Sequence, residues 1–342
     1  AMLARAVKRP RALWLQLRNV PILRMLQLEE ALFRTDRRSW FITNEWDSAQ
    51  PAAEALVLGI SGRPEQMLHV EAAQRSGIPV IKRFTGGGTV VVDSDTLFAS
   101  FIVAEGALPD VKPYPEPMLA WSGELYADAL QRCGVDNFAV RANDYCLHAD
   151  GVDLKFGGNA QSISGKRWLH APHGQGRRPG SGRTGGRTGG RTGGRTGGRT
   201  AAGRAAFGGM CPPARGRRAS RLLSRAWAFG PGNAVSEGPH QRPTSLPPDH
   251  PGTTLLTLTL TRHHTSLLWD YAPSRMALLQ QPAKQPEYRR HRPHESFVKG
   301  LGASLPCRDA FGRALVAAAG ARFELEQVQL EEALPALEAK HR

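Results

Sequence analysis

The sequence predicts an α+β fold, with a mixed and mostly antiparallel sheet packed against helices. Strand-like runs of β-branched and aromatic residues dominate the middle of the chain, and segments with helical spacing lie toward its ends. Between them, residues 171–263 hold 20 of the 37 glycines and a repeat of Gly-Gly-Arg-Thr. Because glycine at this density cannot bury enough apolar surface to offset its ordering entropy, a disordered low-complexity insert is predicted there.

Four segments follow from this composition. Residues 1–12 form a basic N-terminal extension, 13–170 the first part of a folded domain, 171–263 the insert, and 264–342 the second part with C-terminal helices. Residues 1–24 carry six basic side chains and no acid, a pattern typical of an organelle transit segment.

Helices are predicted where apolar residues recur every three or four positions, most clearly where a glycine follows. They cover 22–33, 64–75 before Gly77, 117–133 before Gly134, 295–301, 308–319 and 331–340. Short β-rich runs predict strands over 55–60, 78–81, 89–92, 97–103, 138–141, 154–156, 167–170, 265–271 and 323–330. The runs 89–92 and 97–103 are expected to pair as a hairpin around 93–95. A Thr/Leu alternation over 253–261 is the strand-like piece of the insert.

The formal charge of +15 belongs mainly to the insert. Residues 171–263 contribute fifteen arginines against Glu237 and Asp249, which leaves a net charge of +2 on the rest of the chain. A basic domain surface that follows nucleic-acid phosphates is therefore not expected. The Arg/Gly tract keeps one non-enzymatic alternative open, an RNA-associated protein that binds through this segment. Deletion of 171–263 discriminates, because an RNA-binding protein would lose affinity.

The composition also excludes membrane and disulfide classes. No run reaches the ~18 apolar residues that a bilayer-spanning helix needs, so no membrane partner is expected. The cysteines at 133, 146, 211 and 307 are far apart, without a Cys-x-x-Cys pair or the spacing of a zinc site. A reducing compartment is the default for such a chain.

The first candidate binding segment is a glycine loop between two predicted strands. Three consecutive glycines let the backbone approach a ligand, and successive N–H groups in such a turn form an anion-binding concavity. Two cations directly upstream suit a phosphate or a carboxylate. The alternative is a flexible hairpin loop with surface charges, since the loop is neither a Walker A motif nor G-x-G-x-x-G. The candidate residues are Lys82, Arg83, Thr85, Gly86, Gly87, Gly88 and Thr89.

The second candidate is a lysine before two glycines, downstream of an Asn-Asp pair. An ammonium that projects over bare backbone would stabilise negative charge on an acyl or phosphoryl oxygen. Taken alone, this pattern is more typical of a surface lysine before a glycine bulge. The candidate residues are Asn143, Asp144, Lys155, Gly158, Ala160 and Gln161.

Together, the two segments resemble the lipoate–protein ligase A family, within the larger group of biotin and lipoate protein ligases. The motifs are KRFTGGGTV (82–90), ND (143–144) and KFGGNAQ (155–161). Four other stretches resemble the framework of the family: LRNVPILRMLQLEEAL (17–32), LGISG (58–62), RWLH (167–170) and HTSLLWDY (264–271). KQPEYR (284–289) resembles its eukaryotic branch. The resemblance covers about 13–170 and 264–330, and it implies a biotin/lipoate ligase-like catalytic domain interrupted by the insert.

The resemblance implies a two-step reaction with ATP and Mg²⁺. Lipoate and ATP give lipoyl-AMP and pyrophosphate, and the lipoyl group then passes to a lysine of an acceptor protein. Lys155 is the implied catalytic residue, which holds the acyl and phosphate oxygens. Arg83 and Lys82 would neutralise phosphate, while the glycine loop lies against the ligand. Asn143 and Asp144 would orient the nucleotide, with Asp144 as the candidate Mg²⁺ ligand.

The implied partners are lipoyl-domain proteins, namely the E2 subunits of 2-oxoacid dehydrogenases and the glycine-cleavage H protein. An accessory domain or protein is a further expected partner, because no family accessory domain is recognised after the catalytic part. Acceptors of this kind reside in mitochondria and plastids, so an organelle is the expected location, with the cytoplasm left open.

Two enzymatic alternatives stay open within the same group. One is a lipoyl or octanoyl transferase without its own adenylation step, and the other is a biotin-type ligase. A thioester route would use Cys146 as the nucleophile, whereas a small buried thiol is the commoner role. Mutation of Cys146 to Ser separates the two routes.

The insert also separates RWLH (167–170) from HTSLLWDY (264–271), which are expected to be contiguous in one strand. Natural insertions favour loop tips over strand interiors. We therefore interpret 171–263 as translated intervening sequence that is dispensable for function.

Overall fold

The computed structural model describes residues 9–45, 54–164, 260–282 and 285–340. The predicted strand over 167–170 and most of the predicted insert lie outside these ranges. The predicted extension over 1–12 ends two residues too late, since the first strand already begins at Arg11.

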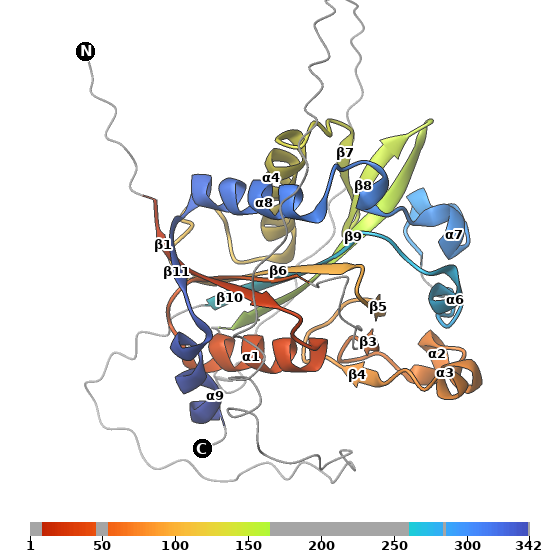
Figure 1. Cartoon of the computed structure of the whole chain (residues 1–342), viewed down its shortest axis with the longest axis horizontal. Helices are drawn as coiled ribbons and strands as arrows, with labels where there is room; N and C mark the ends of the chain where they lie inside the picture. The colour runs from red at the N-terminus through yellow and green to blue at the C-terminus, as the bar shows by residue number, and fades with distance from the viewer. Residues whose placement is uncertain (1–8, 46–53, 165–259, 283–284, 341–342) are drawn as a thin grey trace, which may run out of the picture. The chain divides into compact units, whose positions relative to one another are not determined.

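Eight strands of the described chain form one mixed sheet, in the order β11-β1-β2-β6-β10-β9-β8-β7 (Figure 1). β1 runs parallel to both β2 and β11, whereas the other neighbouring strands are antiparallel. The predicted α+β class is confirmed. The strands are β1 (Arg11–Arg18), β2 (Trp40–Glu45), β6 (Thr96–Ala104), β7 (Phe138–Arg141), β8 (Asp144–Ala149), β9 (Val152–Ser164), β10 (Leu260–Leu268) and β11 (Glu324–Val328).

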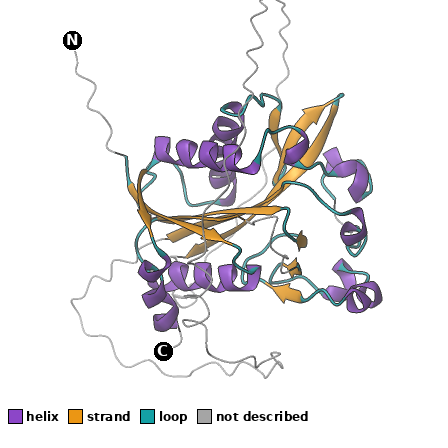
Figure 2. Ribbon diagram, viewed as in Figure 1, coloured by secondary structure: helices purple, strands orange, loops and turns teal. Residues whose placement is uncertain are grey.

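Helices cover both faces of this sheet (Figures 1 and 2). α4 (Pro115–Gln131) packs with α8 (Arg308–Arg322) on one face, and α1 (Ile22–Thr35) packs with α9 (Leu334–Lys340) on the other. Side chains of β2 alternate between the two layers: Phe41 joins the core under α4 and α8, while Trp40 and Ile42 join the core under α1. None of the described helices is long and apolar enough to cross a membrane.

A second, smaller sheet has the order β4-β3-β5, built from β3 (Ala55–Leu58), β4 (Val80–Lys82) and β5 (Val90–Val92). The predicted hairpin of 89–92 with 97–103 is therefore wrong. β5 pairs with β3, and β6 pairs with β2 and β10. Because the two runs belong to different sheets, the residues between them cross from one sheet to the other.

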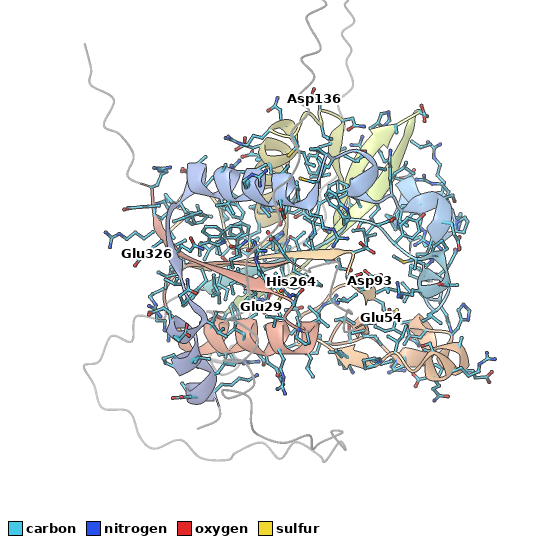
Figure 3. The ribbon with its side chains drawn as sticks, viewed as in Figure 1. Glu29, Glu54, Asp93, Asp136, His264 and Glu326 are labelled. Atoms are coloured by element: carbon cyan, nitrogen blue, oxygen red, sulfur yellow. The ribbon has the colours of Figure 1, made fainter. Side chains whose placement is uncertain are left out.

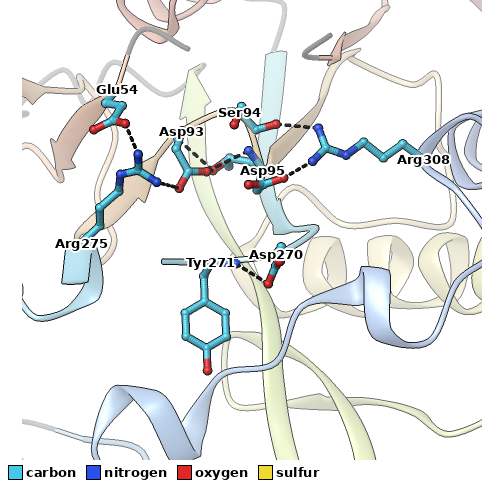
Figure 4. Close-up of polar contacts among 9 residues, drawn as sticks. Glu54, Asp93, Ser94, Asp95, Asp270, Tyr271, Arg275 and Arg308 are labelled. Carbon is cyan, nitrogen blue, oxygen red and sulfur yellow. Dashed lines mark hydrogen bonds and ion pairs between the residues drawn. The ribbon is translucent and has the colours of Figure 1, made fainter. Parts of the chain in front are cut away.

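Two arginines from the second half of the chain hold this crossing (Figure 4). Arg275, in the short helix α6 (Pro273–Met276), lies 3.5 Å from Asp93 Oδ2 and also pairs with Glu54. Arg308 donates to the Ser94 carbonyl at 2.6 Å and pairs with Asp95. These charge-assisted contacts fix the crossing where a hairpin turn was expected.

Several other predicted elements differ at their ends. The predicted helix 64–75 divides into α2 (Pro64–Met67) and α3 (Val70–Ser76), because Leu68 is extended and bridges to Leu279. Gly77 closes α3 with a φ of 68°, as the pattern indicated. The sequence patterns do not predict β1, β2 or β8, and the predicted helix 295–301 is only α7 (His294–Phe297), followed by a 3₁₀ turn.

The second part of the domain begins earlier than predicted. β10 starts at Leu260, so the last four residues of the predicted insert lie in the folded sheet. β10 runs antiparallel to β9 from Leu260 to Leu267, with Ser164 opposite Leu260. Ser164 and Leu260, the described residues on either side of the undescribed segment, are thus register partners in neighbouring strands.

Candidate active site

A pocket of about 320 Å³ opens where the glycine loop between β4 and β5 faces β9 and β10. One part of its wall is apolar, with Ile22 and Leu26 of α1, Val57, Val92 and Phe98. The rest is polar and contains most of the predicted site residues, namely Arg83, Gly86, Gly87, Gly88, Thr89, Asn143, Asp144, Lys155, Gly158, Ala160 and Gln161. Lys82 and Thr85 are not among its lining residues.

The glycine loop is braced from inside by Arg83. Its buried guanidinium donates to the Gly86 carbonyl at 2.9 Å and to the Gly88 carbonyl at 2.7 Å. Burial lowers the pKa of Arg83 to about 10. Gly87 has a φ of 104°, and a Cβ there would lie 2.7 Å from Arg83 Nη2. The loop therefore needs glycine at 87 for its own shape, whereas Cβ atoms at Gly86 and Gly88 would meet open space.

The framework motif LGISG (58–62) packs against the glycine loop. A Cβ on Gly59 would lie 2.3 Å from the Gly87 carbonyl oxygen, so the two backbones approach as only glycine allows. The Ile60 N–H donates to the Thr85 carbonyl at 2.9 Å. The Thr85 hydroxyl is buried without a hydrogen-bond partner in the described chain. Lys82 is exposed on β4, which points to solvent contact for this cation.

A bulge in β9 positions Lys155. The register between β8 and β9 shifts at Tyr145 and Cys146, which pair with Gly157 and Lys155 and leave Phe156 as the extra residue. Gly158 lies beside the ammonium, since a Cβ there would be 3.4 Å from Lys155 Nζ. The bare backbone at Gly158 thus gives the lysine room to reach the pocket.

Lys155 forms an ion pair with Asp144. Its Nζ lies 2.6 Å from Asp144 Oδ1, and Tyr288 Oη donates to Asp144 Oδ2 at 2.6 Å. Both carboxylate oxygens are therefore engaged by protein groups. Among the described residues, no three His, Cys, Asp or Glu side chains gather where they could hold a metal ion. Asp144 as a Mg²⁺ ligand stays a prediction, since a Mg²⁺ ion there would share or replace these two contacts.

The Asn-Asp pair reaches the pocket through the tight turn between β7 and β8. Ala142 has a φ of 50°, as two-residue hairpin loops require, and Asn143 and Asp144 follow it. The Asn143 carbonyl accepts from Asn159 Nδ2 at 2.9 Å. Gln161 donates to the Pro115 carbonyl at 3.2 Å, while its Oε1 is buried without a hydrogen-bond partner in the described part of the chain. Gln161 Oε1 is thus an acceptor that a ligand N–H can satisfy.

A buried polar cluster lies behind the apolar wall. His264 Nδ1 is 3.0 Å from Glu29 Oε1 and 2.8 Å from Ser100 Oγ, and Figure 3 shows Glu29 and His264 near each other between α1 and the sheet. Arg262 forms an ion pair with the same carboxylate and lies 4.6 Å from the centroid of the Phe84 ring. Burial holds the pKa of His264 well below its ordinary value, so its imidazole is neutral where it lines the pocket.

Comparisons with known proteins place this chain among relatives of known description. The family model of the lipoyl protein ligase A/B catalytic domain matches residues 21–172. The resemblance to lipoate–protein ligases is confirmed. Over 143 residues the chain is 26% identical to an "Inactive lipoate--protein ligase 2" of Plasmodium falciparum (isolate 3D7). That match covers 34% of this chain and 37% of the relative, so it spans little more than a third of the curated protein.

Solved lipoate ligases share the fold. A bipartite lipoate protein ligase from Thermoplasma acidophilum, described with its E2 lipoyl domain, gives a TM-score of 0.55 at 14% identity. The match covers 97% of this chain and 91% of that one. A lipoate–protein ligase A bound with ATP gives 0.53 at 13% identity, with 97% and 93% covered. At these identities the likeness establishes the ligase fold.

Local sequence patterns do not mark the apolar half of this pocket. Ile22, Leu26 and Phe98 belong to segments with ordinary core patterns, so nothing local marks them as ligand contacts. No local pattern marks His264 within HTSLLWDY or Tyr288 within KQPEYR as a site residue. Both come from the second half of the chain and meet the first half only in the folded sheet.

Proposed function

We propose that this protein binds lipoate in the pocket, activates it with ATP to lipoyl-AMP, and transfers the lipoyl group to a lysine of a lipoyl domain. In the first step a lipoate carboxylate oxygen attacks the α-phosphorus of ATP, and pyrophosphate leaves. In the second step the acceptor amine attacks the acyl carbon, the bond to AMP breaks, and the amine gives up a proton. The reaction class is that of an acid–amine ligase.

The observation that carries the proposal is the joining of an apolar wall to a cationic end in one pocket. Ile22, Leu26 and Phe98 suit an alkyl chain and a dithiolane ring, while Lys155 lies at the polar end. A preorganised ammonium there stabilises negative charge as it grows on the acyl and phosphate oxygens. A small apolar acid with an activated carboxyl group fits both ends at once.

The remaining polar wall suits the nucleotide. The open sides of Gly86 and Gly88 let a ligand lie against the loop backbone, and Gln161 offers its buried Oε1 to a donor. Asn143, exposed at the turn before Asp144, adds amide groups at the rim. Mg²⁺ accompanies ATP in the family resemblance, but both Asp144 oxygens are engaged here, so no step is assigned to the metal.

A second candidate function is transfer from lipoyl-AMP made elsewhere, without adenylation by this protein. One observation favours it. Of the two cations expected to neutralise phosphates, Arg83 is committed to loop carbonyls and Lys82 lies outside the pocket lining. The triphosphate of ATP carries more negative charge than the single phosphate of an acyl-adenylate. A shortage of available cations therefore disfavours ATP more than the acyl-adenylate. In this version an accessory domain or protein supplies the adenylate.

A thioester route through Cys146 has less support. Cys146 is fully buried and not in the pocket lining, and burial raises the pKa of its thiol to about 11. A thiol in that state has little thiolate to act as a nucleophile. The acceptors named by the resemblance, E2 lipoyl domains and the glycine-cleavage H protein, and an organelle location stay predictions of the same proposal.

Mass spectrometry of an apo lipoyl domain tests the proposal. The domain is incubated with the protein and either lipoate, ATP and Mg²⁺, or preformed lipoyl-AMP. Lipoylation in both reactions supports a complete ligase, and lipoylation only with lipoyl-AMP supports the transferase version. Absence of modification in both, with a folded protein, contradicts the proposed function.

A further inference from the structure

Lys155 and its carboxylate partner are tied to a segment far away in the sequence. Tyr288 lies in the 3₁₀ turn Glu287–Arg289 and reaches across to Asp144, 144 residues earlier in the chain. The Lys299 N–H donates to the Lys155 carbonyl at 2.8 Å, so the same half of the chain also holds the backbone of the lysine.

The position of Tyr288 is fixed from several sides. Its ring lies 5.4 Å from that of Phe297. Arg292 Nη2 donates to the Tyr288 carbonyl at 3.1 Å and to the Asp153 carbonyl at 2.8 Å, which fastens the turn to the start of β9. Arg290 and His291, two and three residues after Tyr288, have positive φ values of 50° and 58°. Two consecutive left-handed residues without glycine persist only where surrounding contacts determine the conformation.

The phenol acts as a hydrogen-bond donor at this point. Burial and the Asp144 carboxylate raise the pKa of Tyr288 well above its ordinary value, so the hydroxyl stays protonated. Cys146 Sγ donates to Tyr288 Oη at 3.6 Å, which leaves the phenol proton directed to Asp144. Asp144 thus keeps one neutral partner on Oδ2 while its Oδ1 faces the ammonium.

The hydrogen bond from Tyr288 to Asp144 bears on how Lys155 reaches the ligand in the proposed reaction. Binding of acyl-adenylate oxygens draws the Lys155 ammonium away from Asp144, because its three N–H donors are then shared between the carboxylate and the ligand. A carboxylate whose only partner departs would be left half-buried and unpaired, which opposes the departure. A fixed donor on the second oxygen lowers that opposition and keeps Asp144 in place.

Resting on the proposed function, we propose that Tyr288 is a positioning residue that holds Asp144 and thereby lets the Lys155 ammonium move its contact from Asp144 to the ligand oxygens. Tyr288 itself touches no reacting atom. Its role is to set where the carboxylate stays while the ammonium moves. The segment after the predicted insert would then contribute to the rate of the reaction as well as to the fold.

The test compares Tyr288→Phe with Tyr271→Phe in the full chain, using preformed lipoyl-AMP and an apo lipoyl domain. Tyr271 is a matched control because its hydroxyl donates to a backbone carbonyl, that of Glu295, at 3.2 Å. Loss of a hydrogen bond to a charged group predicts about a tenfold lower kcat for Tyr288→Phe, with KM for the lipoyl domain changed less than about twofold. Tyr271→Phe is expected to keep the wild-type kcat.

A double variant makes the result specific. If Tyr288 acts through Asp144, adding Tyr288→Phe to Asp144→Asn gives little further loss of kcat, because the two share one function. Wild-type kcat in a folded Tyr288→Phe variant, additive losses in the double variant, or a change confined to KM would each overturn the role of Tyr288 alone. A wild-type chain that transfers nothing from lipoyl-AMP would instead overturn the proposed function, and this inference with it.

Discussion

Lys155 Nζ lies 2.6 Å from Asp144 Oδ1, across the bulge where β9 departs from the register of β8. The side chain of Lys155 is 31% exposed and that of Asp144 is 14% exposed, so the pair stands at the edge of the pocket. A ligand oxygen that binds the Lys155 ammonium would share or take over its contact with Asp144.

Lys155→Ala should remove acyl transfer and leave the fold intact. Among the described residues that line the pocket, Lys155 is the cation available to acyl oxygens, since Arg83 donates to loop carbonyls. Loss of one preorganised charge contact typically costs ~10²–10³ in rate. Lys82→Ala, at an exposed position outside the pocket lining, is the control and should stay close to wild type. Near-wild-type transfer by folded Lys155→Ala would contradict the assignment.

Gly88→Ala and Gly87→Ala should separate ligand contact from loop shape. At Gly88 a Cβ meets open space beside the pocket, so the melting temperature should hardly change while binding of a lipoyl-AMP analogue weakens about tenfold, or ~1.4 kcal/mol. At Gly87 the φ of 104° and the approach to Arg83 predict a stability loss of about 1–3 kcal/mol. Calorimetry and thermal unfolding measure both quantities. Equal losses of stability in the two variants would show that the whole loop is structural.

Acid should destabilise the fold through His263, which is fully buried with its Nε2 2.8 Å from Tyr145 Oη. Burial lowers the pKa of His263 to about 3 from an ordinary value of 6.5. Between these values the unfolded chain binds the proton and the folded chain does not, so stability falls as the pH drops below 6.5. The expected slope is about 1.4 kcal/mol per pH unit for this group.

The check is urea unfolding between pH 7 and pH 5 for the wild type, His263→Gln and the exposed-site control His69→Gln. His263→Gln should show a shallower pH dependence, and His69→Gln should follow the wild type. A pH dependence that is equally steep in all three proteins would locate the effect in other groups.

Cys146→Ser should retain transfer. The thiol is buried and donates to Tyr288, and a serine hydroxyl can replace that contact at slightly shorter reach. An acyl-adenylate route should therefore lose less than about tenfold in kcat, the cost of one weakened hydrogen bond. Trapping with radiolabelled or mass-tagged acyl donor checks for a thioester. Abolished transfer in folded Cys146→Ser, with a wild-type acyl-enzyme adduct at Cys146, would instead favour the cysteine mechanism.

Deletion of 171–263 should give a soluble and active protein. In that variant His170 precedes His264, so a histidine keeps the register position of His263, and Leu169 takes the position of the fully buried Arg262. Gly165 and Lys166 would then join the strand ends as a two-residue turn with glycine first, a favoured hairpin connection. Transcript sequencing across the junction tests the interpretation as intervening sequence.

A second deletion, of 171–259, is the matched control because it keeps β10 as described. We expect both variants to fold and to transfer at wild-type rates or above. If only the shorter deletion folds, Leu260 to His263 are required and the dispensable segment ends before β10. Loss of activity in both variants would show that the removed residues contribute to function, and loss of RNA binding would support the non-enzymatic alternative.

Much of the site followed from local pattern. Two local patterns mark places where the backbone lies close to a ligand or to another segment. They are the run of glycines after Lys82 and Arg83, and the lysine before Gly157 and Gly158. Glycine placement alone is enough to predict such places. The structure gathers these segments in one pocket. Two of these residues differ from their predicted roles. Arg83, predicted to bind phosphate, donates to carbonyls of the loop, and Lys82 is exposed to solvent.

The sequence by itself determined the fold class, the glycine loop and the lysine motif, because periodicity and glycine placement are properties of neighbouring residues. Tertiary structure alone decided which strands pair, since β5 and β6 are adjacent in the chain yet join different sheets. Arg275 and Arg308 contact the residues that cross between these two sheets. It also decided the partners of Lys155. Tyr288 and Asp144 are 144 residues apart, and no local pattern carries a contact that exists only when both halves of the chain have folded together.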